Sequence, residues 1–171
     1  MKPRCPEPSP RKQYKNIKKS HLVEMPTKST VGNAGFSAGA ASDTSLALDC
    51  SNTPYVGYRD FATTKATVMK YSLGSWATVG NAGFSAGSAD YVSFKLDSAN
   101  TPYIAYKDGG SGNKATVMKF DGTNWVTVGN ATGFSAGTST FISLAINSSN
   151  VSYAAYKDGG KADKATVMKY P

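Results

Sequence analysis

The sequence predicts an all-β protein in which one unit of about 49 residues is repeated three times. The copies open near residues 31, 79 and 128 on the letters Val-Gly-Asn, and each continues into Gly-Phe-Ser-Ala-Gly. Each closes on Lys-Ala-Thr-Val-Met-Lys, at 65–70, 114–119 and 164–169. Fixed self-similarity at a period of about 20–50 residues is typical of stacked-repeat architectures. No segment has the 3.6-residue period of a helix, so the repeat unit is expected to consist of strands.

The second copy shows where these strands lie. Residues 91–96 alternate polar and apolar side chains, which indicates a strand with two different faces. Pro102 begins the next strand, because proline is tolerated at a strand's first residue but not inside a ladder. Asp121-Gly122 is a strong hairpin signal between the third strand and the fourth. The strands are expected at 91–96, 103–107, 114–120 and 125–129, with a Gly-rich loop at 108–113.

Four short antiparallel strands in one repeat form one blade of a β-propeller. The predicted fold is therefore a β-propeller segment of three four-stranded antiparallel blades, occupying residues 30–171. Residues 1–29 are rich in Pro, Lys and Ser and lack hydrophobic periodicity, so we expect a disordered basic tail there.

The blades resemble those of tandem-repeat β-propellers of the bacterial type, and kelch-like repeats in style. Gly109-Gly110 follow the second strand and precede Phe120 and Trp125, an order similar to that of kelch repeats. The hairpin 121–125 is similar to the sialidase Asp-box, although Lys119 stands where that motif has Ser or Thr. The resemblance implies a propeller that binds glycans or protein surfaces through its loops, in a secreted or cell-surface setting.

The net charge of +8 is concentrated in the tail. Residues 1–30 hold eight Lys or Arg against two Glu, whereas residues 31–171 hold eleven against nine Asp. The repeat region is nearly neutral, so we expect no nucleic-acid partner. We also expect no secretory signal and no membrane span, because the tail has no apolar run and no segment reaches transmembrane length.

Three blades do not close a ring, since propellers typically have four to eight. The chain begins with a strand of the fourth type near Val31 and stops at Pro171, after a strand of the third type. In one interpretation, two chains close a six-bladed ring and each N-terminal strand completes the partner's last blade. In the other, the chain is a truncated fragment of a longer propeller with no independent function.

The repeat region offers no catalytic set. The chain's single histidine, His21, lies in the tail, and Arg59 is the one arginine of the repeats. The acids of the repeats are all Asp and mostly occupy equivalent turn positions, whereas a glycosidase needs two differently placed carboxylates. We expect no enzymatic activity, no cofactor and no metal ion. A sialidase-like or other glycosidase-derived propeller is the alternative.

Antiparallel strand order places the loops that join blades on the same face as the loops between second and third strands. The polar and aromatic residues of this loop face suit hydrogen bonding and stacking with polar ligands such as sugars. The sequence therefore predicts a non-enzymatic recognition or scaffold module that binds a glycan or a protein through its loop face. The candidate ligand-binding residues are Asn81, Asp90, Tyr91, Asp108, Asn113, Lys114, Asn130, Asp158 and Lys164.

Overall fold

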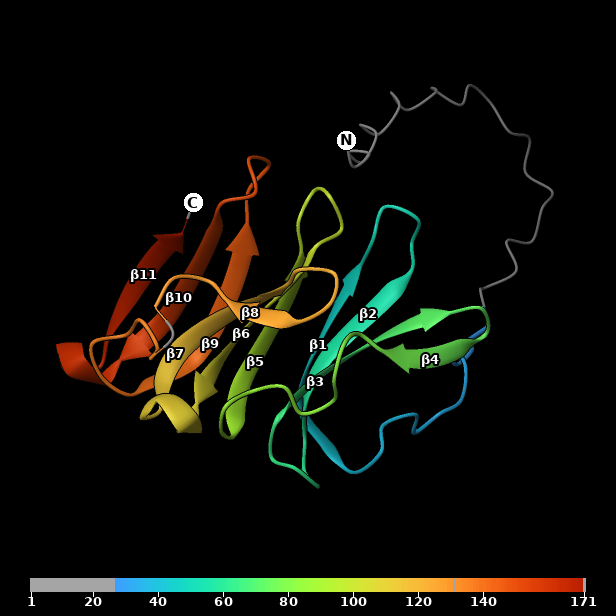
Figure 1. The fold of residues 1–171 in the computed structure, drawn as a ribbon, viewed down its shortest axis with the longest axis horizontal. Helices are drawn as coiled ribbons and strands as arrows, with labels where there is room; N and C mark the ends of the chain where they lie inside the picture. The colour runs from blue at the N-terminus through green and yellow to red at the C-terminus, as the bar shows by residue number, and fades with distance from the viewer. Residues whose placement is uncertain (1–26, 131, 171) are drawn as a thin grey trace, which may run out of the picture.

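The computed structural model describes residues 27–130 and 132–170, which form three antiparallel sheets (Figure 1). The first sheet contains β1 (Ala41–Leu48), β2 (Pro54–Asp60), β3 (Ala66–Ser72) and β4 (Ser75–Thr78). The second contains β5 (Ala89–Leu96), β6 (Pro102–Asp108), β7 (Lys114–Phe120) and β8 (Trp125–Thr127). The third contains β9 (Ser139–Ile146), β10 (Ser152–Asp158) and β11 (Lys164–Tyr170). Most of the predicted basic tail, residues 1–26, lies outside the described residues.

The predicted all-β propeller segment is confirmed, because each sheet is an antiparallel meander that corresponds to one copy of the repeat. Two short 3-10 turns, η1 (Gly109–Ser111) and η2 (Gly159–Lys161), follow β6 and β10. Within the described residues, no helix is long and apolar enough to cross a membrane.

The strand expected near Val31 is not formed in the structure, where residues 27–40 contain no strand. This segment instead lies against the first blade, and the carbonyl of Val31 accepts a 2.9 Å hydrogen bond from Nε1 of Trp76. A strand needs a partner edge, and no described strand of this chain pairs with the segment. The third blade has three described strands, which agrees with the expected order of strand types along the chain.

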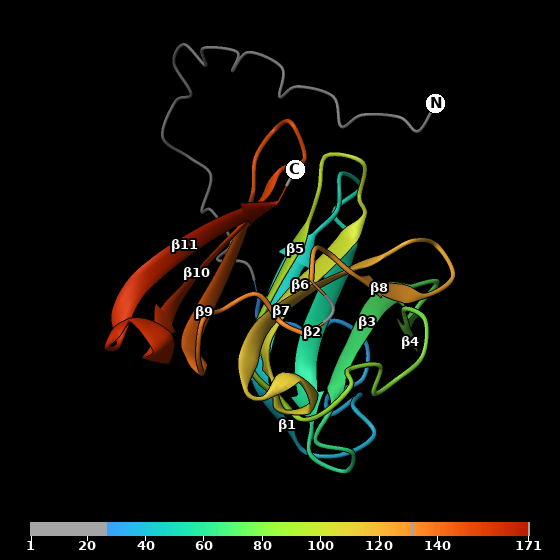
Figure 2. The same ribbon diagram turned by 60° about the vertical axis from the view of Figure 1, so that its left-hand side comes forward.

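The three blades lie side by side in chain order, with β4 and β11 at opposite ends of the molecule (Figures 1 and 2). Their first strands are neighbours and are joined by the same hydrogen bond at both junctions. The amide of Phe94 donates to Oγ of Ser45 over 2.9 Å, and the amide of Leu144 donates to Oγ of Ser93 over 3.0 Å. These equivalent bonds set one blade beside the next in a repeated geometry.

The hydrophobic core lies between blades rather than inside one sheet. Phe94 and Ile104 of the second blade are fully buried with Val68 of the first. Small residues allow this close approach, since a Cβ placed on Gly57 would lie 3.1 Å from the Cβ of Phe94. Burial of one such side chain contributes about 1.5–3 kcal/mol, so each blade depends on a neighbour for its stability.

Candidate ligand-binding site

The segments that lead into the first two blades are fixed by aromatic stacking at the outer rim. Phe84 stacks on Trp125 with ring centroids 4.3 Å apart and planes 10° apart. Phe36 stacks on Trp76 in the same way, at 4.1 Å and 13°. Offset stacking of this kind adds to the area buried, so each loop is held rigidly against its blade.

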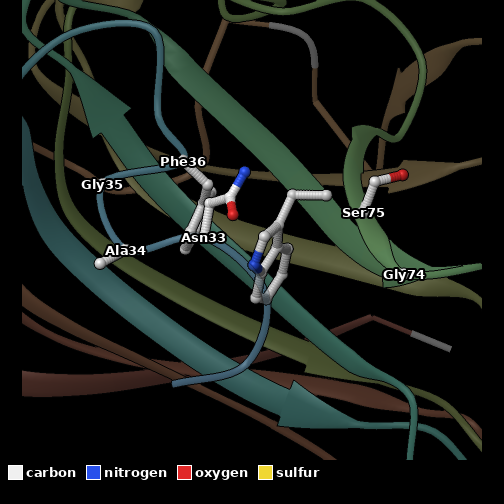
Figure 3. Close-up of a pocket in the computed structure, with 7 residues that line it drawn as sticks. Asn33, Ala34, Gly35, Phe36, Gly74 and Ser75 are labelled. Carbon is white, nitrogen blue, oxygen red and sulfur yellow. The ribbon is translucent and has the colours of Figure 1, made fainter.

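Two equivalent hollows open beside these stacked pairs. The hollow in the first blade has a volume of about 640 Å³, with Asn33 and Phe36 on one side and Ser75 on the other (Figure 3). The one in the second blade, about 360 Å³, contains the predicted site residue Asn81. Asn81 therefore lies at the outer rim beside Trp125, apart from the inner strand β5 that carries Asp90 and Tyr91.

Asp108 and Asp158 hold the loops of the loop face in place through backbone hydrogen bonds. Asp108 is 2% exposed, and its Oδ1 accepts backbone bonds from Gly87 at 3.1 Å and Gly110 at 2.9 Å. Asp158 holds the third blade through the corresponding amides of Gly137 and Gly160. Oδ2 of each carboxylate accepts from a hydroxyl, that of Ser111 or Thr166, so both oxygens are used within the protein and the role of these carboxylates is to fix the loops.

Buried tyrosines lie beside these carboxylates. Burial, and secondarily the charge of Asp108, raises the pKa of Tyr106 above its usual range. Burial, then Asp158 and Tyr170, raises the pKa of Tyr156 to about 12. Both phenols therefore stay neutral at physiological pH and act as packing residues.

The other predicted residues lie at separate turns. Asn113 has a positive φ of 61° at the turn before β7, and Lys114 and Lys164 are the first residues of β7 and β11. Oδ1 of Asn130 accepts bonds from the amide and hydroxyl of Thr132, at 3.1 and 3.0 Å. The structure brings none of these four into contact with Asp90 or Tyr91 through a hydrogen bond or ion pair of the described residues.

Asp90 and Tyr91 are the two predicted residues that the structure places in one cluster. Asp90 bridges the first two blades, with one carboxylate oxygen bound to Arg59 and the other 2.8 Å from Nζ of Lys107. The ammonium of Lys107 also lies 5.5 Å from the ring centroid of Tyr91. One carboxylate is thus held between two cations, and one of these cations touches an aromatic face.

This cluster extends across all three blades as a continuous row of contacts. The guanidinium of Arg59 lies 5.2 Å from the ring centroid of Phe61, at one end. At the other end, the rings of Tyr91 and Phe141 are 5.4 Å apart. Phe61 is 54% exposed and Phe141 is 70% exposed. We call this set the aromatic–charged row; its members are Phe61, Arg59, Asp90, Lys107, Tyr91 and Phe141.

β-bulges position Tyr91 on the first strand of the second blade and Phe141 on the first strand of the third. The register of β5 shifts between Asp90 and Ser93, and β9 shifts at the equivalent place. Tyr91 and Phe141 have φ values of 56° and 53° at these bulges, a conformation uncommon for aromatic residues. Bulges re-aim side chains and are frequent beside functional sites.

The row also contains a donor that the protein leaves unpaired. In the described part of the chain, Nε of Arg59 is buried and has no hydrogen-bond partner. A buried donor without an acceptor costs about 1–3 kcal/mol. An oxygen atom of a ligand or of water would remove this cost.

Sequence reasoning missed Arg59, Phe61, Lys107 and Phe141 as site residues. A usable signal was present, because the row occupies positions where near-identical copies differ. The bulge residue is Asp43 in the first copy, Tyr91 in the second and Phe141 in the third. Phe61 likewise stands where the other copies have Gly109 and Gly159. Asp60, Asp108 and Asp158, which bond to loop amides, are the same in all three copies, so an exposed position that differs between copies is a candidate for another role.

No family model matches the chain, and no curated protein matches its sequence. Among solved structures, a fucose lectin from Kordia zhangzhouensis in complex with methyl-fucoside is 12% identical, covers 74% of this chain and 91% of its own, and has a TM-score of 0.49. An exo-1,5-alpha-L-arabinanase from a bovine ruminal metagenomic library is 8% identical, with a TM-score of 0.44. The match covers 88% of this chain and 61% of the arabinanase. The kelch and Asp-box resemblance stays a prediction.

Proposed function

We propose that the protein is a non-enzymatic recognition module that binds a glycan through the aromatic–charged row. The observation that carries this proposal is the exposed ring of Phe141 packed against Tyr91, beside the ion pair of Lys107 and Asp90. An exposed aromatic surface next to fixed hydrogen-bonding groups is the arrangement that polar ligands with one apolar face require.

A sugar ring has this dual character. Its C–H groups pack on an aromatic face, while its hydroxyls donate to carboxylates and accept from cations. In the row, Tyr91 and Phe141 supply the rings, and Asp90 and Lys107 supply the polar groups. Because Asp90 is already held by two cations, it is oriented before a ligand arrives, which lowers the entropy cost of binding.

A protein surface is the second candidate ligand. The exposure of Phe61 and Phe141 favours it, since exposed aromatic residues and arginine are enriched at the energetic centres of protein interfaces. The spacing of polar groups between the rings makes the glycan the better match, because a protein partner would bury the central ion pair and lose its hydration.

The glycosidase alternative needs a second carboxylate. A retaining or inverting enzyme uses two carboxylates on either side of the scissile bond. Asp90 is the single acid of the row, and two cations neutralise it. Turnover of a fluorogenic sialoside or arabinoside by the full chain would support this alternative over ours.

A glycan array probed with the full chain tests the proposal. We expect the wild-type chain to bind a defined subset of glycans and the Phe141→Asp variant to lose at least about tenfold in affinity, the loss of roughly 1.4 kcal/mol of stacking. The fold tolerates aspartate at this bulge, because Asp43 occupies it in the first blade with a φ of 52°.

Leu73→Asp is the matched control. Leu73 is fully exposed, has a φ of 53° and lies in the β3–β4 hairpin, away from the row. Its substitution is expected to leave glycan binding unchanged. Equal binding by Phe141→Asp and the wild-type chain would contradict the proposal, as would retention of no glycan by the wild-type chain.

A further inference from the structure

The first blade exposes an apolar face that its counterparts bury. Leu46 on β1 is 62% exposed, whereas the equivalent Phe94 and Leu144 are 0% and 1% exposed. Leu48, two residues further along the same strand face, is 56% exposed. We call Leu46 and Leu48 the first-blade face; in the other two blades this face packs against the preceding blade.

The third blade exposes the complementary surface. Val167 on β11 is 63% exposed, whereas Val68 and Val117, in the same Lys-Ala-Thr-Val-Met-Lys segment, are 0% and 1% exposed. Ala165 is exposed as well, although Ala66 is fully buried. We call Ala165 and Val167 the third-blade face; in the first two blades its equivalent packs against the following blade.

We propose that the third-blade face of one copy binds the first-blade face of a second copy, in the same geometry that joins consecutive blades within the chain. The two exposed faces are the two halves of a contact that the chain already makes twice. A second copy is therefore the occupant whose chemistry and shape are shown by the structure itself.

Hydrogen bonds of the internal junctions predict the cross-copy bonds. The amides of Phe94 and Leu144 donate to Oγ of the serine on the preceding blade, Ser45 and Ser93. The next pair in this series is the amide of Leu46 with Oγ of Ser143 from the other copy. Satisfying a backbone amide in this way at an apolar interface avoids the cost of burying it unpaired.

The segment around Val31 has a counterpart in the same series. The amide of Val79 donates to the carbonyl of Val68 over 2.9 Å, and the amide of Val128 donates to that of Val117 over 2.8 Å. The third member joins the amide of Val31 to the carbonyl of Val167 on the other copy. This bond extends the outer edge of β11, which no strand covers in the described residues.

The two faces carry opposite charges near the inner strands. At the first junction, Arg59 of one blade binds an acid at the bulge of the next, Asp90. The residue equivalent to Arg59 in the third blade is Lys157, and the exposed bulge of the first blade carries Asp43. Head-to-tail packing places Lys157, which pairs with Asp163 within its own chain, opposite Ser42, the residue equivalent to Asp90 and the neighbour of Asp43 in the sequence.

The contact joins two different surfaces, so it closes into a ring or continues as a filament. Two copies give six blades, which is within the range of about four to eight that propellers adopt. We therefore expect the finite form, a closed pair of chains.

Light scattering behind size exclusion, on the full chain, tests the inference. The wild-type chain is expected at twice the chain mass of 18.0 kDa. Leu46→Asp and Val167→Asp each place a charge in the contact and are expected to weaken association by about 100-fold or more, because an unpaired buried charge costs several kcal/mol. Leu73→Asp is the matched control and is expected to stay paired; circular dichroism on each peak reports whether the sheets remain folded.

Mixing the two variants distinguishes head-to-tail packing from a symmetric contact. Leu46→Asp retains an intact third-blade face and Val167→Asp an intact first-blade face, so an equimolar mixture is expected to recover association through one good junction. A folded wild-type monomer would overturn the inference. The inference would also be overturned if only one of the two variants dissociated while the other stayed paired, or if the equimolar mixture stayed monomeric.

Discussion

A Cβ placed on Gly87 would lie 2.8 Å from Cα of Gly110, a separation that real side chains do not adopt. The loop that enters the second blade therefore packs directly on the backbone of η1. Gly137 and Gly160 repeat the relationship in the third blade, where the corresponding distance is 2.9 Å. The Gly-Gly pair after the second strand is thus required by the close approach of two loops on the loop face.

Substitution of Gly87 by alanine is expected to destabilise the fold by about 1–3 kcal/mol, the usual cost of overpacking. Gly39→Ala is the control at the same repeat position, where a Cβ would meet Oδ1 of Asp60 at 3.2 Å and Ala62 at 3.5 Å. Urea unfolding is expected to show a clear loss for the first variant and a small change for the second. Equal losses would contradict the close-approach interpretation.

Trp125→Ala is expected to cost about 3–5 kcal/mol of unfolding free energy, the range for truncating a buried large aromatic residue. The variant loses the stack on Phe84 and the 2.8 Å bond from Nε1 to the carbonyl of Val79. Trp76→Ala is expected to cost less, because Trp76 is only half-buried. Guanidinium unfolding measures the free energy of unfolding of both variants. A larger loss for Trp76→Ala than for Trp125→Ala would contradict the role assigned to the Trp125–Phe84 stack.

Replacement of Asp108 by alanine is expected to cost about 1–3 kcal/mol, because the amides of Gly87 and Gly110 would be left without an acceptor. Asp121→Ala removes a carboxylate that also accepts two backbone bonds, at 2.8 Å each, but in an exposed hairpin. Water replaces those bonds, so the thermal midpoint of the Asp121→Ala variant is expected to fall less than that of the Asp108→Ala variant. A larger fall for Asp121→Ala than for Asp108→Ala would contradict the role of Asp108 in fixing the loops.

Alkaline pH is expected to destabilise the fold through its buried tyrosines. The pKa of Tyr106 is raised above the usual 10.0, mainly by burial. A raised pKa means that the unfolded chain ionises first, so stability is fully present below pH 10.0 and is lost as the pH rises above that value. Urea midpoints across this window are expected to fall, with tyrosinate absorbance appearing on unfolding. A midpoint that stays constant or rises would contradict the assigned burial.

The architecture was predictable because the same residues recur where the same backbone recurs. Asp121-Gly122 predicted the β7–β8 hairpin, and Pro102 begins β6 as expected. The strand near Val31 was predicted wrongly; in the other copies the letters Val-Gly-Asn follow the outer strands β4 and β8, which end at Thr78 and Thr127. Residues 27–30 are equivalent to β4, and whether they join a ladder depends on a neighbouring edge, which is a property of the assembly and not of the segment.

The site was only partly predictable. Asp90 and Tyr91 were named, but together with Asp108, whose carboxylate proves to be buried against backbone amides. Burial of this kind is set by the packing of a loop on a turn, which a pattern of residues does not show. Phe141 was missed because the position is aromatic in two copies and acidic in the first, so it broke the repeat on which the prediction relied.

Amide exchange at Leu46, measured by NMR on the full chain, is the most direct test of head-to-tail packing. Phe94 is the internal standard, because its amide is bound to Ser45 at a junction within the chain. We predict that the amide of Leu46 exchanges as slowly as that of Phe94, and that Ser143→Ala accelerates exchange at Leu46 alone. Rapid exchange at Leu46 in a folded chain whose Phe94 amide stays protected would contradict the arrangement.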